Sequence, residues 1–181
     1  MKKIMIALAA VALAVSAQAA SFSWKTSMTG KIYQSGTTTE LTAGTAYLFD
    51  SAAVTQQAVL NAVLGGSDLA SLDSLSNGGV SAGKITGADF SWGNGGDSLS
   101  AFVAIVDGDN VFISDVATGI ADANSKTTVQ FNLKSASQAA AMESTTFTSG
   151  GWYTAAAVPE PTSGLLMLVG LAGLALRRRR A

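Results

Sequence analysis

The chain has 181 residues, a length that fits one ordinary domain with short appendages. It contains neither cysteine nor histidine, which excludes disulfides, thiol nucleophiles, Cys/His zinc sites and catalytic triads with an imidazole base. Eleven Lys and Arg nearly balance twelve Asp and Glu, but six of the eleven basic residues lie at the two ends of the chain. The ends and the middle therefore need separate interpretation.

Residues 1–19 have the pattern of a secretory signal peptide. Lys2 and Lys3 precede an apolar run, Ile4–Val15, and the segment ends in small residues that include Ala17 and Ala19. A basic start, a short apolar core and an A-x-A ending are typical of such peptides, so we expect signal peptidase to cleave after Ala19. The alternative is a buried N-terminal helix.

Residues 158–181 form a second terminal signal in three parts. Val158, Pro159, Glu160 and Pro161 come first, an apolar stretch over 162–176 follows, and Arg177, Arg178, Arg179 and Arg180 come last. A helix over 162–176 would be about 22 Å long against a hydrocarbon core of about 30 Å, a short span that snorkelling arginines can complete. The positive-inside rule places the arginines in the cytoplasm as a membrane stop, which predicts a single C-terminal transmembrane helix. The alternative is a helix of a water-soluble fold with a basic cap.

This order of parts resembles the PEP-CTERM sorting signal of Gram-negative bacteria, which typically accompanies an N-terminal signal peptide. The resemblance implies that an exosortase, a membrane-embedded enzyme similar to cysteine transpeptidases, recognises the tail and cleaves near Pro159-Glu160-Pro161. It further implies an inner-membrane stage with the main domain in the periplasm, followed by transfer to the cell surface or the extracellular matrix. Whether the tail is cleaved or the anchor is permanent stays open. The passenger domains of this family are diverse, so the resemblance implies no activity for residues 20–157.

The middle region, residues 20–157, is an acidic passenger domain. It holds eleven acidic residues against five lysines and no arginine, a net charge of about −6. Binding to phosphate backbones requires a basic surface, so nucleic acid is excluded as a partner.

Period-two alternation of apolar and polar residues predicts half-buried strands in three segments of this domain. The inward residues are expected to be Phe22 and Trp24; Ala88, Phe90 and Trp92; and Val129, Phe131 and Leu133. Two more uniformly apolar runs, 46–49 and 101–106, are typical of central strands. A hairpin is expected at Asp107-Gly108-Asp109-Asn110, because Asp-Gly tolerates the positive φ of tight turns.

Helix is predicted to be the minor element. We expect one helix over 51–64, from Asp50 as N-cap to Gly65-Gly66 as C-cap, and a shorter one over 138–142. Residues 65–82 are expected to form a long loop with a helical turn near Leu69–Leu72, and the glycine-rich 93–97 a second loop. The predicted fold is mainly β: an antiparallel β-sandwich with one packed α-helix, flanked by the signal peptide and the transmembrane helix.

Candidate sites in the passenger domain are few. Asp107, Asp109 and Asn110 are candidate oxygen ligands for a Ca²⁺ ion, but a plain hairpin turn explains the same residues and is the favoured interpretation. We expect no cofactor, no metal and no catalytic activity. The alternative is a carbohydrate-binding or carbohydrate-acting module, with extracellular polysaccharide as partner, for which exposed tryptophans or two acids across a groove would be evidence.

Overall fold

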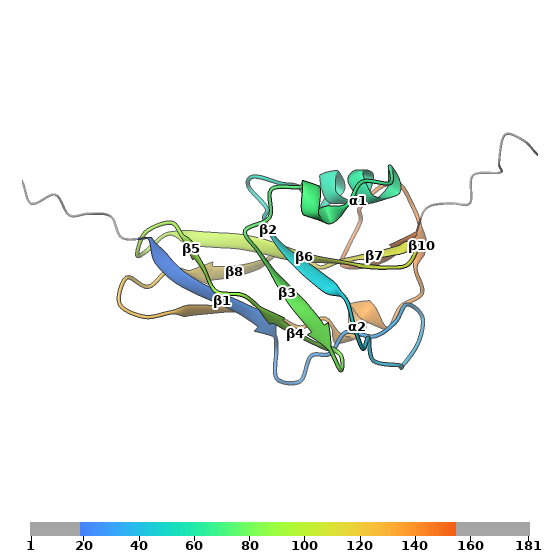
Figure 1. The fold of residues 1–181 in the computed structure, drawn as a ribbon, viewed down its shortest axis with the longest axis horizontal. Helices are drawn as coiled ribbons and strands as arrows, with labels where there is room; N and C mark the ends of the chain where they lie inside the picture. Colours follow the sequence, from blue (N-terminus) through green and yellow to red (C-terminus); the bar gives the residue numbers. More distant parts are fainter. Residues whose placement is uncertain (1–18, 155–181) are drawn as a thin grey trace, which may run out of the picture.

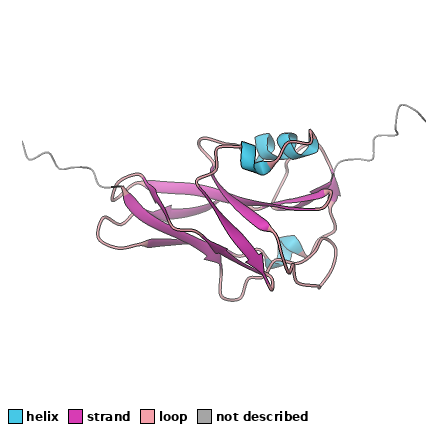
Figure 2. Cartoon of the chain, in the orientation of Figure 1, coloured by secondary structure: helices cyan, strands magenta, loops and turns pink. Residues whose placement is uncertain are grey.

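The computed structural model describes residues 19–154, and these form one layered β-rich unit with short helices (Figures 1 and 2). The strands are β1 (Ala20–Thr26), β2 (Thr45–Asp50), β3 (Ser76–Ser81), β4 (Lys84–Gly87), β5 (Phe90–Trp92), β6 (Ser98–Asp107), β7 (Asn110–Ile113), β8 (Ala117–Ile120), β9 (Thr127–Phe131), β10 (Met142–Glu143) and β11 (Gly151–Thr154). The helices are α1 (Gln56–Leu64), the 3₁₀ turn η1 (Leu69–Ser71) and α2 (Lys134–Ser137).

All eleven strands belong to one hydrogen-bonded sheet. Nine of them follow in the order β10-β11-β7-β6-β2-β3-β4-β1-β5, and the other two branch from this path, β8 on β6 and β9 on β1. The long strand β6 pairs with β7 through its C-terminal half and with β8 through its N-terminal half, and β1 pairs in the same way with β4 and β5. Most pairs are antiparallel; β1–β9 and β10–β11 are parallel. The mainly β, mostly antiparallel class predicted from the sequence is confirmed. The strands form one large open sheet, however, and not the two separate sheets of the expected sandwich.

The sheet curls so that strands far apart in its order share one buried core, which we call the inner core. Phe22 and Trp24 of β1, Leu48 of β2, Val103 of β6 and Trp152 of β11 belong to the same buried cluster. Gly119 of β8 lies against Val129 of β9, so the strand that branches from β6 meets the strand that branches from β1. The alternation predicted for β1 and β9 is therefore confirmed, because one face of each strand lines this core.

A second core lies on the other face of β2, β6, β7 and β11, where α1 and η1 cover the sheet (Figure 1). Phe49 and Phe102 stack there with ring centroids 5.5 Å apart, and Val59 and Leu60 of α1 are buried in the same cluster. Strands β2 and β6 are thus covered on both sides, which confirms their prediction as central strands and the packing of one helix on the sheet.

The predicted helix over 51–64 begins five residues late. Residues 51–54 form turns, with the Asp50 carboxylate accepting a hydrogen bond from the Ala52 amide at 2.9 Å. Thr55 is the N-cap of α1, and its hydroxyl accepts from the Ala58 amide at 3.1 Å. Gly65 is the C-cap, as expected. Asp50 and Thr55 are both residues that favour the N-cap position, and the helix begins after Thr55.

The hairpin β6–β7 is confirmed, with Asp107 opposite Asn110 and a positive φ of 59° at Gly108. The predicted loop over 65–82 is wrong in its second half, because residues 76–81 are strand β3. A two-residue turn at Ala82 and Gly83, with φ values of 47° and 69°, joins β3 to β4. Positive φ at both central residues is the requirement of a type I′ hairpin turn.

Four further expectations have mixed outcomes. The helical turn near Leu69–Leu72 and the loop over 93–97 are confirmed. The second helix lies at Lys134–Ser137, four residues before the predicted 138–142. Phe90 and Trp92 lie in β5, whereas Ala88 lies outside it and is exposed.

Candidate functional site

The last strand, β11, ends directly before the C-terminal tail and is fixed in the core by two aromatic residues. Trp152 and Tyr153 are both 0% exposed. The Trp152 indole donates hydrogen bonds to the carbonyls of Tyr33 (3.2 Å) and Ser137 (3.0 Å). The chain is therefore anchored by packing and by buried hydrogen bonds up to the end of the strand.

The hydroxyl of Tyr153 organises the loop before β11. It accepts hydrogen bonds from the amides of Thr148 (3.0 Å) and Ser149 (3.1 Å) and donates to the carbonyl of Ser149 (2.6 Å). At the end of the strand, Thr154 pairs with Asn110 of the β6–β7 hairpin. Packing on both faces and hydrogen bonds along the strand hold β11 in place.

The sorting residues predicted from the sequence, Val158–Pro161 and Arg177–Arg180, lie outside the described residues, as do the predicted transmembrane helix and Ala17 of the cleavage motif. Ala19 is exposed, and Ala20 is the first residue of β1. Ala20 is 3% exposed, and its amide donates to the carbonyl of Gly93 at 3.1 Å. Between residues 19 and 154, no helix is both long and apolar enough to cross a membrane.

The candidate calcium ligands Asp107, Asp109 and Asn110 form the tip of the β6–β7 hairpin. Asp109 is exposed, and its backbone carbonyl accepts from the Thr154 hydroxyl at 3.5 Å. Asp115, the next acidic residue along the chain after this hairpin, is engaged with another loop, because its carboxylate accepts a hydrogen bond from the Gly150 amide at 2.8 Å. Within the described part of the chain, no three acidic, histidine or cysteine side chains are grouped to hold a metal ion. The calcium site at Asp107, Asp109 and Asn110 therefore stays a prediction.

The aromatic residues contribute to the core and form no exposed platform in residues 19–154. Trp24 is 1% exposed and Trp152 is fully buried, while Trp92 is half-buried at the edge of the inner core, where it meets Phe22 edge-on at 6.0 Å. The Trp24 indole donates to the hydroxyl of Ser76 at 3.0 Å. Sugar rings need an accessible aromatic face for stacking, and the buried Trp24 and Trp152 offer none.

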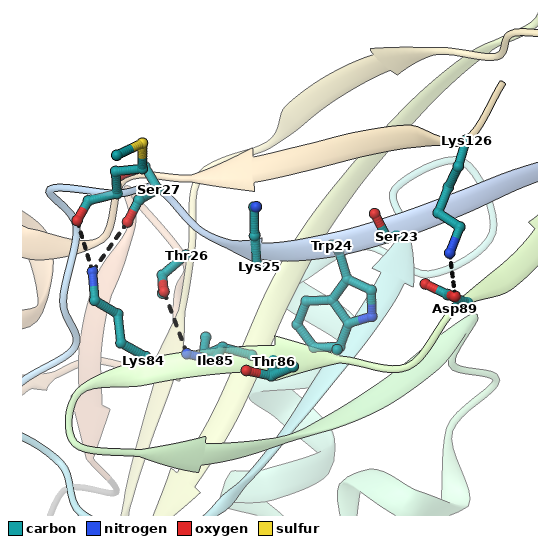
Figure 3. Close-up of a pocket in the computed structure, with 12 residues that line it drawn as sticks. Ser23, Trp24, Lys25, Thr26, Ser27, Lys84, Ile85, Thr86, Asp89 and Lys126 are labelled. Carbon is teal, nitrogen blue, oxygen red and sulfur yellow. Dashed lines mark hydrogen bonds and ion pairs between the residues drawn. The ribbon is translucent and has the colours of Figure 1, made fainter.

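A hollow of about 600 Å³ is lined by residues of β1 and β4, by Ser27 and Met28 after β1, and by Asp89 and Lys126 (Figure 3). Its walls carry Lys25, Lys84, Lys126 and Asp89, and Met28, 90% exposed, lies at its rim. The sequence pattern did not indicate this hollow, because its residues come from strands that are distant in the chain.

Two of the three lysines in this hollow have partners in the fold. The ammonium of Lys84 donates to the carbonyls of Ser27 (3.2 Å), Met28 (2.9 Å) and Gly30 (2.6 Å) and so closes the loop after β1. Lys126 pairs with Asp89 across the hollow. Because Lys84 and Lys126 are engaged by the protein itself, Lys25 is the one lysine of the hollow without such a partner in the described residues. A site for an anionic ligand generally needs several basic groups that are free to bind it.

Two titratable groups outside the hollow have shifted pKa values. Hydrogen bonding to Glu40 raises the pKa of Lys31. The Ser125 hydroxyl, followed by the Asn124 amide, lowers the pKa of Asp122 below the ordinary 3.8. Lys31 and Glu40 form an ion pair that is partly exposed to solvent, and Asp122 lies in the exposed loop between β8 and β9.

Comparison with known proteins gives one match. A family model described as the PEP-CTERM protein-sorting motif matches residues 157–180. These are nearly the same residues as the tail identified in the sequence. No curated protein and no solved structure matches the chain. The chain therefore carries a PEP-CTERM protein-sorting motif at residues 157–180, the mark of an exported protein that an exosortase sorts.

Proposed function

We propose that this chain is a non-catalytic protein of the cell surface or extracellular matrix of a Gram-negative bacterium. A signal peptide cleaved after Ala19 directs it across the inner membrane. The apolar segment over 162–176 then holds it there, with the domain in the periplasm and Arg177–Arg180 in the cytoplasm. Exosortase cleavage near Pro159-Glu160-Pro161 ends this stage and transfers the domain outward.

The observation that carries the proposal is the position of the sorting motif relative to the fold. The motif match begins at residue 157, three residues after β11 ends at Thr154. Cleavage near the motif would leave every described strand in place. The N-terminal side has the same arrangement, because cleavage after Ala19 leaves β1 complete from Ala20.

The acidic residues support a non-catalytic role, because most of those described have local structural partners. Asp50, Asp68, Asp97, Asp115 and Asp122 each accept a backbone amide, and Glu40 and Asp89 pair with lysines. Glycoside hydrolysis needs two carboxyl groups facing one another across a substrate site. The hollow at β1 and β4 is lined by one carboxylate, Asp89, which is paired with Lys126. The burial of Trp24 and Trp152 likewise weighs against the alternative of a carbohydrate-binding module.

The test is mass spectrometry of the protein from cells with and without exosortase. With exosortase, the product is expected to begin at Ala20 and to lack Arg177–Arg180. Without exosortase, or with Pro159, Glu160 and Pro161 all replaced by alanine, the tail is expected to remain and the protein to stay in the membrane fraction. A product that keeps its arginines in cells with active exosortase would contradict processing and favour a permanent anchor. A glycan array on residues 20–157 tests the carbohydrate alternative.

A further inference from the structure

The tether between the folded domain and the sorting motif is short compared with the domain itself. Thr154 is held in the sheet, and the five peptide units from Thr154 to Pro159 span at most about 18 Å. A domain of this size has a radius of gyration of about 14 Å and a diameter of roughly 35 Å. An enzyme that holds the motif therefore meets the folded domain at the same time.

The place where the chain leaves the sheet determines which part of the domain the enzyme meets. Thr154 lies between two neighbours, Asn110 of the β6–β7 hairpin and Glu143 of β10. Gly108 and Asp109 form the hairpin tip next to it and are exposed. We name this surface, made of Gly108, Asp109, Asn110, Glu143 and Thr154, the exit face. It lies at the opposite end of the long axis from the start of β1 (Figure 1).

The tether is not readily lengthened by removing β11 from the sheet. Such removal would expose Trp152 and Tyr153, both fully buried, and break four residue pairs with β7. The Tyr153 hydroxyl would also leave the loop amides of Thr148 and Ser149 without their acceptor. Peeling β11 away thus amounts to unfolding this end of the domain.

We propose that the exit face is the surface of the folded domain that contacts the periplasmic side of the membrane-embedded sorting enzyme during cleavage. The inference rests on the proposed function and adds to it a defined contact surface. The exit face is polar, so the contact is one of close approach and accommodation, with no apolar patch to bury. Bulk added at the exit face should therefore hinder cleavage, and a longer tether should relieve the hindrance.

The chain has no cysteine, so a single introduced thiol can carry a bulky label. Asp109→Cys places the label on the exit face. Asn124→Cys, in the exposed loop between β8 and β9 at the opposite end of the domain, is the matched control. The full chain is labelled with polyethylene glycol maleimide and incubated with exosortase-containing membranes, and loss of the tail is followed by mass spectrometry. Each labelled variant is compared with its own unlabelled form.

The label at position 109 is expected to slow tail loss at least about tenfold, since it holds the motif away from the enzyme, while the label at position 124 changes the rate little. A Gly/Ser insertion of about fifteen residues after Ala156 adds roughly 20 Å of reach and should restore the rate with the label at position 109. Equal rates for labelled and unlabelled Asp109→Cys, or slowing that the longer tether does not relieve, would overturn the inference. If the unlabelled native chain keeps its tail, both with its own tether and with the longer one, the proposed function is overturned as well. This outcome is distinguishable from failure of the exit-face inference alone, because it is seen without any label.

Discussion

The substitution Gly87→Ala tests the packing of Trp24 in the inner core. A Cβ atom at position 87 would lie 2.1 Å from both Cε2 and Nε1 of the Trp24 indole, well inside van der Waals contact. Trp24 is held by burial and by its hydrogen bond to Ser76, so the indole and β4 cannot both keep their positions. Glycine at position 87 thus provides the space that the indole occupies.

The size of the effect follows from which group moves. Shifting the backbone or forcing the side chain off its rotamer costs about 1–3 kcal/mol. Expelling the indole approaches the cost of deleting a buried large aromatic, about 3–5 kcal/mol. We expect a loss of about 3 kcal/mol in the free energy of unfolding, which for a domain of this size lowers Tm by roughly 10 °C.

Urea unfolding of residues 20–157, followed by tryptophan fluorescence, measures this loss, and calorimetry gives the change in Tm. Gly79→Ala on the adjacent strand is the control, because no atom lies within 4 Å of a Cβ there and its φ is not positive. The control should change stability little or raise it slightly. In a Trp24→Val background, the cost of Gly87→Ala should nearly vanish. Equal effects of the two alanine substitutions, or an undiminished cost in that background, would refute the packing argument.

Three further predictions concern polar groups. Tyr153→Phe removes the acceptor of two loop amides and should lower the free energy of unfolding by about 1–3 kcal/mol in urea titration, while an unchanged midpoint would mean that water replaces the hydroxyl. Lys84→Met removes the ammonium that joins three carbonyls and should speed amide hydrogen exchange over residues 27–30, with Lys25→Met as control; identical exchange in both variants would contradict the loop-closing role. The lowered pKa of Asp122 means that its turn is stabilised by the carboxylate above the ordinary value of 3.8 and loses this contribution as the pH falls through the lower folded-state value. An NMR titration midpoint below 3.8 that rises in Ser125→Ala would support this, and a midpoint insensitive to that substitution would not.

The local alternation of apolar and polar residues predicted the strands that have one buried face and one face exposed to solvent. The alternation in β1 and β9 and the Asp-Gly turn between β6 and β7 each follow from the chemistry of neighbouring residues. Strand β3 was not predicted because Ser76–Ser81 contains two glycines and a single large apolar residue, Val80, and so shows no alternation of apolar and polar residues. It is a strand because β2 and β4 pair with it on both sides, and no local pattern records that pairing.

The candidate sites likewise divide into one that is contiguous in the sequence and others that the fold assembles from distant residues. The sorting tail is contiguous in sequence, so its order of Pro-Glu-Pro, apolar stretch and arginines could be recognised directly. The hollow at β1 and β4 joins residues more than fifty positions apart, such as Lys84 and Met28, and the exit face joins Asn110 to Thr154. Such surfaces depend on strand order, which the alternation of apolar residues does not fix.

The described chain begins and ends at opposite ends of its long axis (Figure 1). While the proposed anchor holds the C-terminal end near the lipid, the rim beside the start of β1, formed by the loops over 93–97 and 121–126, lies at the far end of the domain. An antibody or binding partner arriving from the aqueous side would reach that rim first, and an epitope tag placed before Ala20 would be displayed at the full height of the domain.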